Sequence, residues 1–309
     1  MTAGDVLCWL CAAIAALGNA TANVMQRKAD LDQRDEDSPF GLHVLRRLVH
    51  NPTWVLGITG MVVSFGLQAT ALALGPLSVV EPIITLEVPL TLLIAGHVFG
   101  ARLARGEWLA IASMTGGMIA LVASLDPQPG DEANVSHMTY VVAGTGTTAT
   151  IAVLVFMGTR GGRIWRTACL GAATGTCFGF TATLMKETVE QLTHRGIVGL
   201  LSTWQTYAAV FFGLLGVWIM QWALHTGPLL ASQPGFTLMD PVVSILWGVL
   251  VYNEVTRSGG WLVLSVAGMG ALALGVLMLA RSPVLNEVKE GEPADQLTAA
   301  DVRHARATT

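Results

Sequence analysis

Three acidic residues lie deep inside long apolar stretches of the sequence, where ionisable groups are otherwise absent. Glu81 and Glu87 fall within residues 77–99, and Asp240 falls within 227–252. A carboxylate at the centre of a lipid bilayer costs about 3 kcal/mol on insertion scales, unless it faces a cavity or a partner group. Such acids are typical of sites that bind a cation or relay a proton. The competing interpretation is a protonated acid that hydrogen-bonds to a neighbouring helix.

Other residues near these acids suit the same chemistry. Counted at about 1.5 Å per residue, Glu87 lies about 15 Å into its stretch and Asp240 about 20 Å into the other, so both are near the midplane. A proline within a helix removes a hydrogen bond and frees carbonyl groups at membrane depth. The prolines predicted to kink these helices are Pro82, Pro89, Pro234 and Pro241. Further candidates for binding a substrate or ion are Asn19, Asn23, Gln68, Gln221, Trp218 and Tyr207. For the amides, hydrogen bonding between helices is an equal alternative.

The elements that carry these residues are predicted to be transmembrane helices. The chain has 309 residues, of which 52% are hydrophobic and 12% charged, and its net charge is −4. Each of nine stretches reaches the roughly 17–25 apolar residues that a helix needs to cross a bilayer. They are residues 4–25, 53–74, 77–99, 107–124, 138–158, 165–186, 199–224, 227–252 and 260–280. The sequence therefore predicts an all-α integral membrane protein with about nine transmembrane helices.

The composition also excludes several functions. No basic patch of useful size exists outside short loops, so we expect no nucleic-acid partner. Signatures of hydrolases and of phosphate-binding loops are absent, so we expect neither an enzyme nor a cofactor. The four cysteines give no disulfide framework, and we interpret them as small packing residues of helices, with no metal assigned. They are Cys8, Cys11, Cys169 and Cys177.

The basic residues predict how the chain is oriented. With nine spans, fourteen of the seventeen Lys and Arg residues fall on one side. Because basic residues favour the cytoplasmic side, we expect a multi-pass protein of the cell (plasma) membrane with its N-terminus outside and its C-terminus in the cytoplasm. The segment 40–50 is too short to cross a bilayer, and we predict that it forms a cytoplasmic interfacial helix. Residues 282–309 predict a flexible cytoplasmic tail.

The sequence contains an internal repeat. Residues 71–96 match residues 223–248 without a gap at 10 of 26 positions. The identities include the pairs Gly75/Gly227, Pro76/Pro228, Pro82/Pro234 and Pro89/Pro241. The first span repeats more weakly at an offset of 160 residues, for example at Leu10/Leu170 and Met25/Met185.

The repeat is predicted to be inverted. Four spans in 4–124 return the chain to its starting side, and the linking helix 138–158 turns it over, so the second repeat in 165–281 enters from the opposite face. Inverted repeats are typical of secondary transporters, whose site lies near the midplane between the halves. The alternative is an old duplication that persists only as a scaffold.

At these residues the chain resembles the drug/metabolite transporter superfamily of the EamA type. The resemblance rests on the Gly-Pro turns that begin at Gly75 and Gly227, on Pro82 and Pro234, and on Glu254. The segment from Asn51 to Val88 is similar to the NIPA-type magnesium transporters, and so is the basic cluster Gln26-Arg27-Lys28. Where that pattern has Gly-Glu-x-x-Asn, however, this chain has Gln68 in the last position and Phe65 in place of the acid.

We therefore expect a secondary transporter that moves a small neutral or cationic solute by alternating access, with a proton at Glu87 or Asp240 as a candidate coupling ion. An anionic substrate would lack a counter-charge, because no Lys or Arg lies near the midplane. The resemblance implies one alternative, a magnesium or other divalent-cation transporter of the NIPA type. Another is a non-transporting membrane component that serves assembly or lipid handling. The sequence leaves the substrate, the direction of transport and the oligomeric state open.

Overall fold

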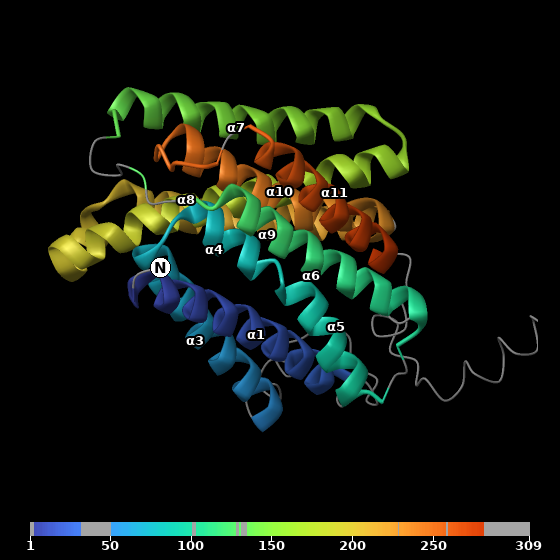
Figure 1. Cartoon of the computed structure of the whole chain (residues 1–309). Coiled ribbons are helices and arrows are strands. Elements are labelled where there is room, and N and C mark those ends of the chain that lie inside the picture. Colours follow the sequence, from blue (N-terminus) through green and yellow to red (C-terminus); the bar gives the residue numbers. More distant parts are fainter. Residues whose placement is uncertain are drawn as a thin grey trace, which may run out of the picture.

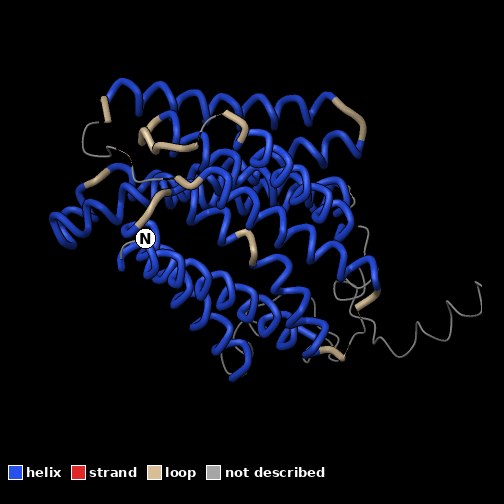
Figure 2. Tube along the Cα trace, viewed as in Figure 1, coloured by secondary structure: helices blue, strands red, loops and turns tan. Residues whose placement is uncertain are grey.

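The computed structural model is a bundle of long α-helices (Figures 1 and 2). It describes residues 3–31, 51–100, 103–127, 130, 135–227, 229–257 and 259–280, and within these residues it contains no β-strand. The helices are α1 (Ala3–Leu31), α3 (Pro52–Leu74), α4 (Leu77–Ile84), α5 (Glu87–Val98), α6 (Arg105–Leu125), α7 (His137–Arg160), α8 (Arg163–Ser202), α9 (Trp204–Thr226), α10 (Leu229–Leu250) and α11 (Trp261–Ala280). The segments 40–50 and 282–309, for which we predict an interfacial helix and a tail, lie outside the described residues.

The helices have the length and composition of membrane spans. Eight helical segments of the described chain are long and apolar enough to cross a bilayer, when α4 and α5 are taken together as Leu77–Val98. The eighth predicted span, residues 227–252, forms α10, which is not among these eight segments. Many large apolar side chains point outward, including Val62, Leu214 and Val263. Since a bilayer is the solvent that favours such a surface, the chain is a multi-pass helical membrane protein, as predicted.

The third predicted span is broken between two of the candidate acids. The break is the turn at Thr85 and Leu86, where the Leu86 amide bonds to the Ile83 carbonyl at 3.0 Å instead of continuing the α-helical ladder. Pro89 has no N–H with which to continue that ladder. α4 therefore ends at Ile84 and α5 begins at Glu87, with Pro89 in its first turn. By contrast, α10 continues as one helix through Pro234 and Pro241.

The sixth predicted span is longer than the sequence indicated. We expected it to end at Lys186 and a loop to follow, but α8 continues to Ser202 with non-helical backbone only at Gly196. Lys186 is buried rather than part of a polar loop. The residues that follow Lys186 are polar, so the apolar stretch ends there although the helix does not. Hydropathy marks the end of an apolar stretch, and for this reason the predicted end of the span was too early.

Two of the helices approach closely because glycines face each other. α6 packs against α11, and a Cβ atom added to Gly117 would lie 2.6 Å from the Gly268 carbonyl oxygen. Conversely, a Cβ atom at Gly268 would lie 2.8 Å from the Gly117 carbonyl oxygen. The Ser124 and Ser265 hydroxyls form a hydrogen bond of 2.7 Å between the same two helices. Small residues are the usual means by which transmembrane helices come into contact.

We expect Gly117→Leu to force α6 and α11 apart and to destabilise the fold by about 3 kcal/mol, the upper part of the range for overpacking. The matched control is Gly116→Leu, because a Cβ atom at Gly116 meets nothing within 4 Å. The measurement is the apparent unfolding temperature of the purified protein in detergent at one fixed scan rate. Equal unfolding temperatures for the two variants would contradict this account of the crossing.

The predicted linking helix forms α7, which runs along the edge of the bundle (Figure 1). It packs against α8 and is also tied to α10 by the Trp247 indole, which donates to the Thr147 hydroxyl at 3.0 Å. Most of its large apolar side chains face outward, among them Met138 and Val142. α7 is thus a peripheral helix, and the interior of the bundle is formed by the helices before and after it.

Candidate functional site

Glu87 is held at the start of α5 by amides of α1. The Asn23 side chain donates a hydrogen bond of 2.7 Å from its Nδ2 to Glu87 Oε1. Asn19 interacts with the same carboxyl group. Because residues four apart lie on one face of a helix, α1 presents both amides to α5. Two of the amides predicted from the sequence are thus brought to one of the predicted acids.

Glu81 is the most buried of the three acids, with 2% of its surface exposed. It lies on α4, one turn into the helix, and its Oε1 accepts a hydrogen bond of 3.0 Å from Gln68 Nε2. Gln68 comes from α3, so this bond ties two neighbouring spans of the first half. Gln68 lies three positions after Phe65, where the resemblance would place an acid, and it interacts instead with an acid supplied by α4.

Asp240 joins these two acids from the second half of the chain. It lies on α10, which packs against α4, and it interacts electrostatically with both Glu81 and Glu87. A Cβ atom at Gly179 of α8 would lie 2.7 Å from the Asp240 carbonyl oxygen, so α8 lies directly behind this part of α10. Both halves of the chain therefore contribute to one acidic cluster, which we define as Glu81, Glu87 and Asp240.

The surroundings of the acidic cluster contain amides but not a compact set of metal ligands. Within the described residues, no three His, Cys, Asp or Glu side chains converge closely enough to hold a metal ion. Glu87, Asp240, Asn19, Asn23 and Gln68 have intermediate exposure. The cluster is thus a largely buried group of carboxyl groups and amides, a combination that can attract a cation or exchange a proton.

Three predicted site residues do not reach the acidic cluster. Tyr207 and Trp218 are 61% and 62% exposed on α9, and Gln221 is exposed on the same helix. The Tyr207 hydroxyl donates to the Leu201 carbonyl at 2.7 Å, and the Trp218 ring contacts Trp222. α9 packs chiefly against α8, which leaves most of its circumference facing outward. Depth along the helix was predicted from the sequence, but the direction of these side chains was not.

A second buried polar group, which the sequence reasoning missed, connects the halves at the turn between α3 and α4. Lys186 of α8 donates to the Gly75 carbonyl at 2.7 Å and to the Leu72 carbonyl at 3.3 Å. Both carbonyls belong to the end of α3 and the residue that follows it. A cation here also complements the negative end of the α3 dipole.

Glu254, between α10 and α11, completes this connection. Its Oε1 accepts from the Leu77 amide at 2.7 Å and its Oε2 from the Ser78 amide at 3.2 Å, and the Ser78 hydroxyl also donates to Oε2. Burial raises the pKa of the Glu254 carboxyl, against the effect of the Ser78 bonds and the Lys186 charge. We call Lys186, Glu254 and Ser78 the interhalf clasp, because their contacts join the end of α3 and the start of α4 to the second half of the chain.

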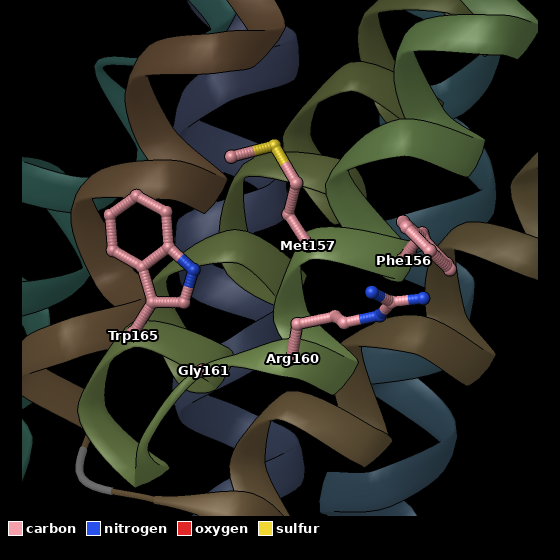
Figure 3. Close-up of a pocket in the computed structure, with 5 residues that line it drawn as sticks. All are labelled: Phe156, Met157, Arg160, Gly161 and Trp165. Atoms are coloured by element: carbon pink, nitrogen blue, oxygen red, sulfur yellow. The ribbon is translucent and has the colours of Figure 1, made fainter.

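A pocket of about 310 Å³ lies elsewhere, at the turn between α7 and α8. Figure 3 shows its lining residues, namely Phe156, Met157, Arg160, Gly161 and Trp165. The Arg160 guanidinium lies 4.4 Å from the centre of the Phe156 ring. None of these residues belongs to the acidic cluster or to the interhalf clasp, so the pocket is a separate feature of the molecular surface.

Among known proteins the chain has a relative that matches most of its length. The chain is 29% identical over 262 residues to an uncharacterized protein of Corynebacterium glutamicum, a match that covers 83% of this chain and 88% of the relative. No family model matches the chain, and no solved structure matches it. Because the match extends over most of both chains, the similarity is not confined to a single motif.

Proposed function

We propose that this protein is a secondary membrane transporter that moves a small neutral or cationic solute by alternating access. The observation that carries the proposal is the acidic cluster, to which the first half contributes Glu81 and Glu87 and the second half contributes Asp240. An acid in a membrane span is costly unless it faces a cavity or serves an ion, and three together raise that cost. A cluster shared by both halves is where a carrier would hold its solute.

The packing of the helices supports an arrangement of two related halves. α1 packs against α3 and α4, and α8 packs against α9 and α10, which are their counterparts in the sequence repeat. The counterparts α6 and α11 pack against each other, and so do α4 and α10. Contacts of this kind are expected when two similar units face each other across an axis. The inverted repeat, and with it membership in the drug/metabolite transporter superfamily, is part of our proposal.

The orientation is part of the proposal as well. With the N-terminus outside and the C-terminus in the cytoplasm of the cell membrane, the clasp residues would lie at the outer face and Arg160 at the inner face. The prediction is that a single cysteine at Arg160 reacts with a membrane-impermeant reagent only in inside-out vesicles. A cysteine at Asp126 is the opposite control and reacts only in right-side-out vesicles. The reverse pattern would contradict the assigned orientation.

The function is tested with the purified protein in proteoliposomes. The measurement is the flux of small solutes with and without an imposed pH gradient, together with the flux of Mg²⁺ reported by an entrapped fluorescent indicator. The proposal expects protein-dependent flux of a neutral or monovalent cationic solute. Flux of Mg²⁺ alone would favour the NIPA-type alternative. Absence of flux for every solute would favour the non-transporting alternative.

A further inference from the structure

Asp240 differs from the two acids beside it in how its oxygens are satisfied. Glu81 accepts a hydrogen bond from Gln68, and Glu87 accepts one from Asn23. The Asp240 Oδ1 atom is occluded and has no hydrogen-bond partner. A buried acceptor without a donor costs about 1–3 kcal/mol, so an unpaired carboxylate oxygen calls for a donor that the chain itself does not supply.

The charges around Asp240 define what kind of donor fits. Its electrostatic neighbours are Glu81 and Glu87, both acidic. Like charges that lie close to one another repel, and the repulsion grows as the effective dielectric constant falls. The buried cation Lys186 is engaged with the carbonyls that end α3. A donor that is itself a cation would therefore satisfy the free oxygen and offset the repulsion among the three acids.

We propose that Asp240 binds the ammonium group of a monovalent organic amine, with an N–H of the ligand donating to Asp240 Oδ1. Glu81 and Glu87, held by their amides, supply the negative field around the ammonium group. This inference rests on the proposed transport function and names the substrate class of the same site. It assigns Asp240 the direct contact and gives the two glutamates a supporting electrostatic role.

The geometry distinguishes an amine from a metal ion. Mg²⁺ requires oxygen ligands at about 2.0–2.1 Å in a nearly octahedral shell, and Glu81, Glu87 and Asp240 do not converge on such a point. An ammonium group needs only one good acceptor and a negative surrounding. A short alkylammonium ion is therefore a suitable probe of this substrate class.

The test measures binding to the purified full-length protein at constant ionic strength. The probes are methylammonium, n-butylammonium, tetramethylammonium and Mg²⁺, and the readout is calorimetric binding together with the shift in unfolding temperature. We expect n-butylammonium to bind at least about tenfold more tightly than tetramethylammonium, which carries no N–H, because a tenfold difference corresponds to one modest hydrogen bond. Asp240→Asn should abolish this preference, whereas the control Asp126→Asn, in an exposed ion pair with Arg257, should retain it.

Three results would overturn the inference: no binding of either primary amine, equal binding of n-butylammonium and tetramethylammonium, or unchanged preference in Asp240→Asn. The comparison between the two amines is made on the wild-type protein, so it decides the matter even if Asp240→Asn fails to fold. If proteoliposomes carry a neutral solute but no amine binds, this inference fails while the proposed transport function stands. If no solute moves at all, the proposed function fails independently.

Discussion

Replacing Glu87 by Gln and Asp240 by Asn together is expected to reduce the initial rate of protein-dependent solute flux at least tenfold, a loss that corresponds to about 1.4 kcal/mol of interaction with the moving solute. The physical reason is that the double variant removes the charge that both halves contribute to the acidic cluster while it preserves the shape of both side chains. The measurement is the initial rate of flux in proteoliposomes with matched amounts of inserted protein.

The control for this experiment is Asp126→Asn. The Asp126 carboxylate lies at the end of α6, is half-exposed and is paired with Arg257. This variant should retain the flux of the wild-type protein. If the wild type and the double variant had identical flux rates for every solute that moves, the acidic cluster would have no role in transport.

Lys186→Met is expected to be the most destabilising substitution in the interhalf clasp, by about 3–5 kcal/mol, the cost of breaking a buried ionic group by removing one member. The variant leaves the Leu72 and Gly75 carbonyls without their donor and leaves the Glu254 carboxyl without its nearby cation. The measurement is the apparent unfolding temperature in detergent at a fixed scan rate, because membrane proteins commonly unfold irreversibly.

Two further variants make this prediction specific. Lys28→Met, at an exposed position near the end of α1, should change the unfolding temperature little. Adding Glu254→Gln to Lys186→Met should recover part of the loss, because the second change removes the uncompensated charge. If Lys186→Met and Lys28→Met unfolded at the same temperature, the clasp would have no part in holding the halves together.

The sequence identified the acidic cluster because of one physical rule. Ionisable groups are so costly in apolar surroundings that Glu81, Glu87 and Asp240 stood out, and the structure brings all three together. The same rule failed for Lys186 and Glu254, since both lie next to polar segments and were assigned to span ends. Their contacts join residues more than a hundred positions apart along the chain, and nothing in the local pattern shows them.

The direction in which side chains point from each helix was the second feature that the sequence predicted only in part. Asn19 and Asn23 could be placed together because their spacing of four sets one helical face. α9 is apolar on all sides, so its pattern carries no information about which face is inward, and the exposed positions of Trp218 and Tyr207 could not be predicted. Proline content was an incomplete guide to helix breaks, because the break between α4 and α5 lies between Pro82 and Pro89, whereas α10 continues through Pro234 and Pro241.

The most direct test of the central claim is whether the acidic cluster is reached from both sides of the membrane. Val88 lies beside Glu87 and is partly exposed, so a single cysteine at this position in a cysteine-free chain reports on the cluster without removing an acid. With a membrane-impermeant thiol reagent, we predict labelling in both right-side-out and inside-out vesicles. Labelling from one side only, or from neither side, would contradict alternating access to a site between the two halves.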